Sequence, residues 1–436
     1  MPTSNNIWNT MNNKNFAMRT RHNHIHQLVG THLRTVISIA VLMLCSSIRA
    51  INEADSRQRL FTTGEKDAIP YRIPAIATCS NGDLIAASDY RYCGSDIGYG
   101  AVDLVYRISC DNGKTWSEEK ILADGQGNEA DIKWDYAFGD CALVADKKSS
   151  EVLATCAAGK TVYFQATRNN PNRIAIFRSY DNGKTWDKGH EITEQIYRLF
   201  DQRKAGPIQS LFFTSGKIHQ SRHVKVGKYY RLYVGLCTLS GNFVLYSDDF
   251  GRQWNVLGDI NTSPCRDGDE VKCEELPDGS LILSSRHNGR LFNVFTFSNL
   301  KKAEGSWGQR TKAAAFSGIE NECNGEILVV PAIRKADGRK TFVAIQSVPF
   351  GPQRTRIGFF YKDLGRKHLT SQQLADGWQR GTMVATGLGA YSTMTLQKDG
   401  RIGFLWESGP TIYNIDYQSL KLENITNGKY QLKGKF

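Results

Sequence analysis

A segment that recurs three times constrains the fold of this chain more than any other feature of its sequence. The copies share the pattern S-x-D-x-G-x-T-W, with glutamine in place of the threonine in the third. They span residues 109–116, 179–186 and 247–254. Their aspartates lie 70 and 68 residues apart, and a worn fourth copy, without the serine and the tryptophan, runs from Tyr361 to Gly365. A period of this length predicts a repeat architecture.

Each copy follows a short strand-like run, such as 105–108 or 174–177, so its Asp-x-Gly segment falls where a hairpin must turn. In such a turn the aspartate accepts backbone N–H bonds, the glycine supplies a positive φ, and the tryptophan packs back on the hairpin. The clearest helix candidate is the polar stretch 191–204. Residues 51–436 number 386, which gives about six units of the size of four-stranded blades. The sequence therefore predicts an all-β, six-bladed β-propeller with Asp-box hairpins.

The first 50 residues have the layout of a signal peptide with a long basic lead. An apolar run from Val36 to Leu44 precedes the small residue Ala50, after which we expect cleavage. The run has nine residues, whereas a membrane-spanning helix needs about 20, so no transmembrane anchor is expected. The mature chain, 51–436, is then one exported domain, secreted, periplasmic or at the cell surface. Lipidation at Cys45 and a start at Met18 are the alternatives.

Ten cysteines without a paired CxxC support neither a structural zinc site nor a small disulfide-rich scaffold. Cys265 and Cys273 can close a short loop, and buried free thiols are the alternative. Lys and Arg number 55 against 43 Asp and Glu, and the resulting net charge of +12 favours anionic partners such as nucleic acid, acidic lipid or acidic sugar.

The tetrapeptide Tyr71-Arg72-Ile73-Pro74, upstream of the repeated boxes, resembles the bacterial-type sialidases of glycoside hydrolase family 33. The resemblance runs from about Leu60 to Glu407. It implies a single sialidase β-propeller domain over 51–436 and a retaining exo-α-sialidase that needs no metal or organic cofactor. The expected substrates are sialylated glycoproteins, glycolipids or oligosaccharides.

A sialoside carries a carboxylate on its anomeric carbon, and the planar fork of arginine binds a carboxylate bidentately. The resemblance supplies three arginines for this task, Arg72, Arg286 and Arg354. Arg356 lies two residues further on, and in a regular strand it would point to the same face, so it is the alternative for the third position.

A carboxylate nucleophile would be repelled by the substrate's own carboxylate, whereas a neutral phenol is not, and sialidases use a tyrosine. Tyr391 matches the family's nucleophile motif, and Glu270, 16 residues before Arg286, matches the glutamate that takes the phenolic proton. Glu322 has a similar local sequence, but Glu270 is preferred because an Asp-Gly turn and Arg286 follow it.

Asp96 lies 24 residues after Arg72 on a Gly-flanked loop and resembles the family's acid/base aspartate. Its neighbours Asp89 and Asp103 are expected to be solvated at turns or strand edges. The resemblance implies three further roles. They are an additional sugar-binding arginine at Arg91, a residue of the N-acetyl pocket at Asp140, and an ion-pair partner of Arg72 at Glu407.

Two other classes of function are weighed against the enzyme. A catalytically inactive Asp-box propeller that binds sialic acid as a lectin would be expected to lose Tyr391, Glu270 or Asp96, and all three are present. A nucleic-acid-binding protein would need a basic helix, a zinc module or an aromatic RNP-like strand, and none accompanies the positive charge. Linkage preference, hydrolysis versus transfer, and oligomeric state are not indicated by the sequence.

Overall fold

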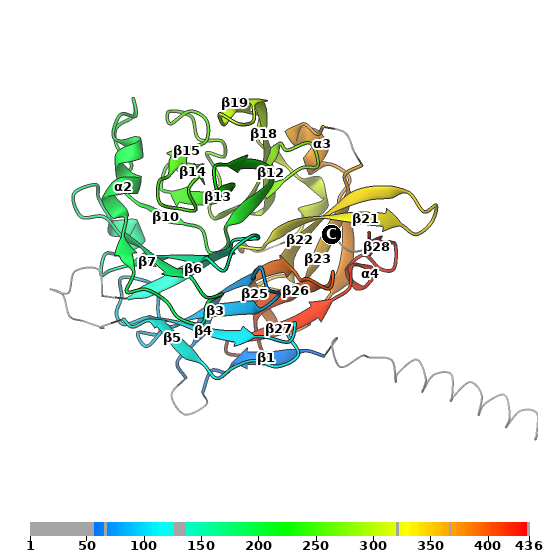
Figure 1. Ribbon diagram of the computed structural model, residues 1–436, viewed down its shortest axis with the longest axis horizontal. Coiled ribbons are helices and arrows are strands. Elements are labelled where there is room, and N and C mark those ends of the chain that lie inside the picture. Colours follow the sequence, from blue (N-terminus) through cyan, green and yellow to red (C-terminus); the bar gives the residue numbers. More distant parts are fainter. Residues whose placement is uncertain (1–55, 65–67, 126–136, 320–321, 366–367, 434–436) are drawn as a thin grey trace, which may run out of the picture. The chain divides into compact units, whose positions relative to one another are not determined.

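A computed structural model describes residues 56–64, 68–125, 137–319, 322–365 and 368–433, which fold mainly as β-strands (Figure 1). The chain divides into Met1–Ser56 and Arg57–Phe436, and the fold below is that of the second unit. The predicted signal peptide, with Cys45 and Met18, lies outside the described residues. Among the described residues, no helix has both the length and the apolar character that crossing a lipid bilayer requires.

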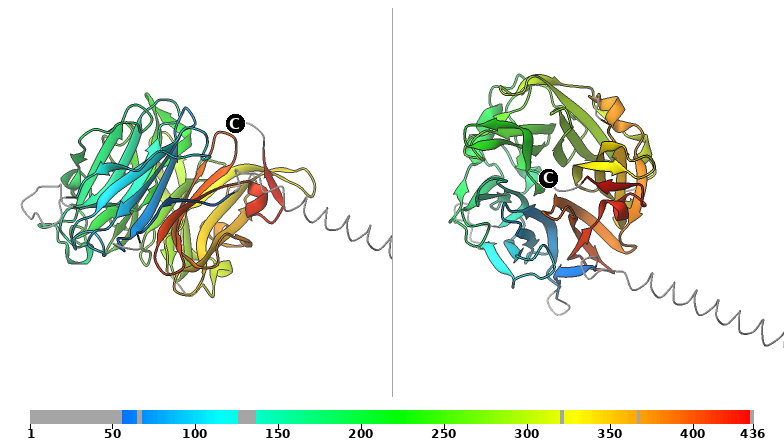
Figure 2. Two further views of the ribbon diagram at one scale, coloured as in Figure 1. Left: turned by 90° about the horizontal axis from the view of Figure 1, so that it is seen from below. Right: turned by 45° about the vertical axis from the view of Figure 1, so that its right-hand side comes forward.

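The strands form five hydrogen-bonded sheets, which stand around a common centre (Figure 2). The first three sheets have the following members, in their order of pairing. The first consists of β2 (Tyr71–Thr78), β3 (Leu84–Tyr90), β4 (Asp103–Ser109) and β5 (Lys120–Ala123). The second consists of β11 (Gly216–Lys217), β6 (Phe138–Ala145), β7 (Val152–Ala158), β8 (Arg173–Ser179) and β9 (His190–Glu191). The third consists of β10 (Leu211–Phe213), β13 (Tyr229–Thr238), β14 (Gly241–Ser247) and β15 (Asn255–Val256), with β12 (His219–Val226) also on β13.

The remaining strands form a five-stranded and a nine-stranded sheet. The smaller consists of β16 (Val271–Glu275), β17 (Leu281–His287), β18 (Gly289–Asn299) and β19 (Glu304–Trp307), with β20 (Thr311–Lys312) also on β18. The larger consists of β1 (Gln58–Phe61), β27 (Asn414–Leu420), β26 (Ile402–Gly409), β25 (Leu388–Leu396), β23 (Thr355–Asp363), β22 (Lys340–Gly351), β21 (Ile327–Arg334) and β28 (Tyr430–Leu432), with β24 (Gln379–Met383) also on β23.

Two pairings in the nine-stranded sheet connect distant parts of the chain. β1 runs antiparallel to β27, so the first described strand joins a sheet whose other strands all lie between Ile327 and Leu432. β23 and β25 are linked by one pair of residues only, Thr355 and Leu388. On either side of this link the strands form two separate groups of hairpins.

Apolar side chains on both faces of the strands build the core between neighbouring sheets. In one cluster, Ile85 and Leu104 of the first sheet pack with Leu143 and Phe177 of the second. β7 is buried along its whole length, because it lies inside its sheet and is covered on both faces. Strands of this kind read as continuous apolar runs rather than as alternating patterns.

Helices are few among the described residues. The α-helices are α2 (Thr193–Tyr197), α3 (Ser371–Ala375) and α4 (Leu422–Ile425). The 3₁₀ turns are η2 (Tyr163–Gln165), η3 (Arg198–Phe200) and η4 (Ala314–Phe316). The helix predicted over 191–204 is therefore much shorter than expected. Glu191 pairs as the end of β9, and beyond Phe200 the chain turns.

The repeated boxes form turns with one hydrogen-bonding pattern. In the second copy, the Ser179 hydroxyl donates to Asp181 over 2.8 Å and accepts the Gly183 N–H over 2.8 Å. Asp181 also accepts the Thr185 N–H over 2.9 Å and the Thr185 hydroxyl over 2.6 Å. The first and third copies repeat the serine bonds and the bond to the N–H four residues after the aspartate. Gly183 has a φ of +84°. An added Cβ there would lie 2.3 Å from the Ile85 side chain, so the turn needs glycine for two reasons.

The nine described cysteines are all free. Cys265 and Cys273 are buried in one apolar cluster with Leu283 and Phe295, so the alternative of buried thiols holds and the short disulfide loop does not form.

Replacing Asp181 tests whether these turns serve stability alone. Asp181→Ala removes the acceptor of three hydrogen bonds, so the free energy of unfolding should fall by about 1–3 kcal/mol. The cavity described below should not change, because the turn contributes nothing to its lining. Urea unfolding measures the first quantity, with Lys184→Ala on the exposed side of the same turn as the control. Equal stability of the two variants would contradict the structural interpretation.

Candidate active site

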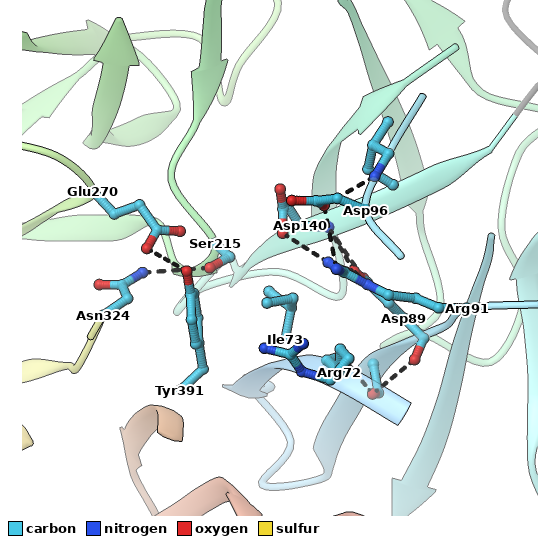
Figure 3. Close-up of polar contacts among 12 residues, drawn as sticks. Arg72, Ile73, Asp89, Arg91, Asp96, Asp140, Ser215, Glu270, Asn324 and Tyr391 are labelled. Atoms are coloured by element: carbon cyan, nitrogen blue, oxygen red, sulfur yellow. Dashed lines mark hydrogen bonds and ion pairs between the residues drawn. The ribbon is translucent and has the colours of Figure 1, made fainter. Parts of the chain in front are cut away.

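One cavity of about 430 Å³ gathers most of the residues that the sequence singled out (Figure 3). Eight of the nine predicted site residues line it. They are Arg72, Arg91, Asp96, Asp140, Glu270, Arg286, Arg354 and Tyr391. Glu407, the ninth, is fully buried and binds the side chain of Arg72 instead. Figure 3 shows Tyr391 and Glu270 on one side of Arg72, and Arg91 with its aspartates on the other.

Tyr391, Glu270 and Arg286 form a closed triangle of polar contacts. The Tyr391 hydroxyl donates to Glu270 Oε2 over 2.7 Å. Arg286 Nη1 donates to the same carboxylate oxygen over 2.8 Å and to the Tyr391 hydroxyl oxygen over 3.0 Å. Glu270 lies just before the start of β16, and Arg286 lies opposite it near the end of β17. The Arg286 N–H donates to the Glu270 carbonyl over 2.8 Å. Their spacing in the sequence thus reflects one hairpin.

Burial dominates the acid–base properties of this triangle. It raises the pKa of Tyr391 well above its ordinary value of 10, and the Glu270 carboxylate raises it further, while Arg286 opposes the shift. Burial also raises the pKa of Glu270, against the attraction of Arg286. The phenol is therefore neutral at rest. Its proton has a short path to Glu270, and a phenolate that forms there has Arg286 within hydrogen-bond distance.

Beneath the cavity, Glu407 accepts hydrogen bonds from one side chain and two backbone N–H groups. Its Oε1 accepts Arg72 Nε over 2.6 Å and the Ile73 N–H over 2.9 Å, and its Oε2 accepts the Tyr391 N–H over 3.0 Å. The Arg72 guanidinium also lies 4.7 Å from the centre of the Tyr413 ring. Burial disfavours the charge of Arg72, yet the Glu407 carboxylate keeps the pKa of Arg72 above its ordinary value. Tyr413 was not singled out from the sequence, because nothing distinguishes it there from other tyrosines.

Arg354 reaches the cavity from the turn between β22 and β23. Its carbonyl accepts the Gly389 N–H over 2.8 Å, and the Arg356 N–H donates to the Gly387 carbonyl over 3.0 Å, so the turn is attached to the strand that carries Tyr391. The Arg354 guanidinium lies 5.5 Å from the centre of the Tyr391 ring. Arg356 is exposed and is not among the described residues that line the cavity. Side chains two residues apart share one face only in a regular strand, and this segment is not regular, because Arg354 and Arg356 have positive φ values of +57° and +61°.

Arg91 stands at the centre of three aspartates. It binds Asp89 through Nη2 at 2.9 Å, Asp96 through Nη1 at 3.2 Å and Asp140 through Nη2 at 3.5 Å. The side chain of Asp96 is 62% exposed, whereas that of Arg91 is 5% exposed. Asp96 is therefore the member of this cluster that can meet a ligand from solvent.

The expectation that Asp89 and Asp103 are solvated is wrong. Asp89 is fully buried and accepts the Asp140 N–H over 3.0 Å as well as the Arg91 guanidinium. Asp103 is 2% exposed and accepts the Gly125 N–H over 2.7 Å. Both lie in paired strands that are covered by neighbouring sheets, which a short sequence window does not reveal.

Burial raises the pKa of Asp89 to about 6, although Arg91 lowers it. It also raises the pKa of Asp140 well above the ordinary value, and the charges of Asp96 and Asp89 add to that rise. Asp140 has a positive φ of +55°, and Gly139 beside it has no room for a side chain, because an added Cβ would lie 2.7 Å from Asp89 Oδ2. The tight packing fixes Asp140 against Arg91.

Glu322 and Asp269 are the two remaining acidic candidates near these elements. Glu322 is exposed and does not line the cavity, so the structure brings Glu270 to the phenol and not Glu322. Asp269 does line the cavity, and its carboxylate lies 3.4 Å from Arg286 Nε. The sequence analysis missed it, although its position next to Glu270 is a signal. Within the described ranges, no group of three or more His, Cys, Asp and Glu side chains is arranged to hold a metal ion.

No family model matches the chain, but curated proteins do. A sialidase of Micromonospora viridifaciens is 26% identical over 388 residues, which cover 85% of this chain and 55% of that protein. A sialidase of Paraclostridium sordellii is 24% identical over 416 residues, which cover 88% of this chain and 94% of that protein. The chain thus spans about half the length of the first relative and nearly all of the second.

Solved structures give the same picture at the level of the fold. A Hadza microbial sialidase has a TM-score of 0.65 at 21% identity, covering 85% of this chain and 69% of that one. The NanB sialidase of Streptococcus pneumoniae has a TM-score of 0.63 at 16% identity, covering 86% and 71%. The fold is therefore the all-β propeller of these proteins. The curated matches along most of its length, together with this fold, make the chain similar to the bacterial sialidases, and glycoside hydrolase family 33 is consistent with these matches.

Proposed function

We propose that this protein is an exported, retaining exo-α-sialidase that hydrolyses terminal sialic acid from glycoproteins, glycolipids or oligosaccharides through a covalent intermediate on Tyr391. The observation that carries the proposal is the contact of the Tyr391 hydroxyl with Glu270 beneath Arg286, in a cavity that is also lined by Arg72 and Arg354. The same residues could bind sialic acid without turning it over, and the experiments below separate a lectin from an enzyme.

The three arginines bind the carboxylate of the substrate. Each lines the cavity from a different sheet or turn, and each keeps its positive charge because nearby groups offset the effect of burial on its pKa: Glu407 for Arg72, Tyr391 and Glu270 for Arg286, and Cys323 and Tyr391 for Arg354. A bound carboxylate places the anomeric carbon next to the phenol, as the nucleophilic step requires. Asp140 and Arg91 bind the sugar on the opposite side of the cavity, near the N-acyl group.

In the first half of the reaction, the Tyr391 oxygen forms a bond to the anomeric carbon while its proton moves to Glu270. The bond to the leaving oxygen breaks, and Asp96 gives that oxygen a proton. Asp96 suits this role because it is the exposed member of the Arg91 cluster and lies on the wall of the cavity. Arg286 stabilises the phenolic oxygen as negative charge develops on it.

In the second half, Asp96 takes a proton from water, and the water oxygen bonds to the anomeric carbon. The bond to Tyr391 breaks, and the phenolic oxygen recovers its proton from Glu270. Two displacements at one carbon return the original configuration. Protons and bonds balance over the cycle, and no metal or organic cofactor takes part.

The fold and the location of the protein complete the proposal. If the nine-stranded sheet is divided at the Thr355–Leu388 link, the strands form six groups, which we assign as six blades with β1 completing the last one. The boxes at 109–116, 179–186 and 247–254 are then Asp-box hairpins on three successive blades. Residues 1–50 serve as a cleaved signal peptide, and 51–436 form the single exported domain.

Removing the phenolic hydroxyl tests the nucleophile. Tyr391→Phe should lower kcat on a fluorogenic aryl sialoside by about 10²-fold or more, because the ring stays in place and only the attacking oxygen is lost. Tyr413→Phe is the matched control, because the Tyr413 ring also packs against a site arginine. Its kcat should fall by no more than about threefold. Full activity of Tyr391→Phe would remove Tyr391 as the nucleophile. An inactive wild-type protein that still binds sialosides would favour the lectin.

Comparing two neighbouring arginines tests the binding of the carboxylate. Arg354→Ala should lower kcat/KM by about 10- to 150-fold, the equivalent of losing a hydrogen bond to a charged group. Arg356→Ala should leave kcat/KM nearly unchanged, because its side chain is exposed outside the cavity. Steady-state kinetics on one substrate measures both variants. The reverse order would assign the third carboxylate-binding position to Arg356.

The role of Asp96 is tested with two leaving groups. Asp96→Asn should lower the rate on sialyllactose by about 10²–10⁴-fold, because a sugar hydroxyl needs a proton to leave. The loss on an aryl sialoside should be much smaller, because a phenolate leaves without one. Because a misfolded fraction would lower the rate on both substrates equally, the ratio of the two losses also controls for folding. Equal losses on both substrates would show that Asp96 does not act as the acid.

A further inference from the structure

A second polar layer lies directly beneath the Tyr391–Glu270 pair. Lys272 follows Glu270 by two residues on β16, and Thr393 follows Tyr391 by two residues on β25. The backbone is irregular at Tyr391, so the layer is defined by its contacts: Lys272 and Thr393 both reach the carboxylate of Glu326. Lys272 is 2% exposed and Thr393 is fully buried. None of the reaction steps above uses them.

One buried carboxylate connects the two strands in this layer. Glu326, which is fully buried, has its Oε2 3.8 Å from Lys272 Nζ and accepts the Thr393 hydroxyl over 3.2 Å. Lys272 Nζ also donates to the Ser215 carbonyl. The partners of the ammonium are thus a carboxylate and a carbonyl, which accept hydrogen bonds and favour its charged form. An added Cβ on Gly216 would lie 2.6 Å from Lys272 Nζ, so the layer is closely packed.

The buried lysine interacts electrostatically with the base of the proposed reaction. Burial lowers the pKa of Lys272, and the charges of Glu326 and Glu270 act against that change. The neighbours of Lys272 come from several elements, and they also include a second lysine and an arginine. The charged and titratable groups around Lys272 are Glu270, Glu274, Glu326, Lys217 and Arg290. Those around Glu270 are Tyr391, Arg286, Asp269, Lys272, Arg290, Asp140, Cys237 and Cys323.

We propose that Lys272 is a positioning residue for the sialidase reaction, and that its ammonium acts through Glu270 by keeping that carboxylate ionised and ready to accept the Tyr391 proton. The proposal rests on the proposed function. Glu326 is the counter-charge that makes the buried ammonium tolerable, and its bond to Thr393 holds β25 beside β16 at the layer below the reacting groups.

The sign of each charge effect follows from Coulomb attraction. Lys272→Met removes a positive charge from the second residue after Glu270, a backbone spacing of about 7 Å in a strand, so ionised Glu270 is less stable and its pKa rises. Glu326 stays paired in this variant, because Lys217 Nζ lies 3.8 Å from its Oε1. Glu326→Gln removes the opposite charge and should lower the pKa of Glu270. The double variant Lys272→Met/Glu326→Gln removes both charges and should return the pKa close to the wild-type value.

The acid limb of kcat/KM against pH reports the ionisation of the free enzyme, and it is measured on a fluorogenic aryl sialoside. The limb should move to higher pH by about one unit in Lys272→Met and to lower pH in Glu326→Gln, and the double variant should restore it. Lys272→Arg keeps the charge, so its acid limb should stay at the wild-type pH, while its larger side chain is expected to lower the rate in this closely packed layer. Lys217→Met is the matched control, because this lysine contacts Glu326 one layer further away and should shift the limb less.

A purely structural role would lower the rate of both single variants without moving their acid limbs in opposite directions. Shifts in one direction, or no shift, in variants that melt cooperatively would overturn the inference. If Lys272→Met does not fold, Glu326→Gln and the double variant decide the outcome. Glu326→Gln leaves the positive charge of Lys272 in excess, and the double variant removes one charge of each sign. An inactive wild-type enzyme would instead remove the proposed function, so the two failures are distinguishable.

Discussion

A single buried carboxylate holds the site together. Glu407 accepts the guanidinium of Arg72, the backbone N–H of Ile73 and the backbone N–H of Tyr391, and so ties together the first sheet and the two strands β25 and β26. A buried carboxylate with three donors has its charge compensated, so it is a rigid anchor rather than an energetic burden. Loss of this one side chain would remove the carboxylate partner of the partly buried Arg72 guanidinium and leave two buried backbone N–H groups without their acceptor, and would loosen the attachment of both Arg72 and Tyr391.

Irregular backbone directs several side chains of the cavity wall. The ladder is interrupted between Arg72 and Ala75, between Gly139 and Ala142, and between Gly389 and Ser392. Each interruption lies next to or contains a residue of the cavity wall, among them Ile73, Asp140 and Tyr391. Bulges of this kind re-aim side chains that a regular strand would point to one of two faces. Positive φ at Ile73 and Asp140 has the same effect at single residues.

These irregularities also mark how far the sequence could predict the site. The spacing of Glu270 and Arg286 and the tetrapeptide around Arg72 are local patterns, and the structure brings both into the cavity. The burial of Asp89 depends on the sheet that covers it, and the choice between Arg354 and Arg356 depends on left-handed backbone in a turn. Neither the burial of Asp89 nor the left-handed backbone can be predicted from the alternation of polar and apolar residues along a strand. The predicted β-rich fold was similarly accessible from the repeat, whereas the joining of two hairpin groups into one sheet by a single residue pair was not.

The pairing of β1 with β27 has a consequence for the order in which the molecule is assembled. Tyr391 and Glu407 belong to strands that lie in the same sheet as β1, and more than three hundred residues separate the partners in the sequence. Contacts of such long separation form late, because the entropy of closing a large loop must first be overcome. A nascent chain that has emerged only partly therefore carries Arg72, Arg91 and Asp96 but not yet Tyr391 and Glu407. The wall of the cavity is complete only after the C-terminal strands have joined the rest of the fold.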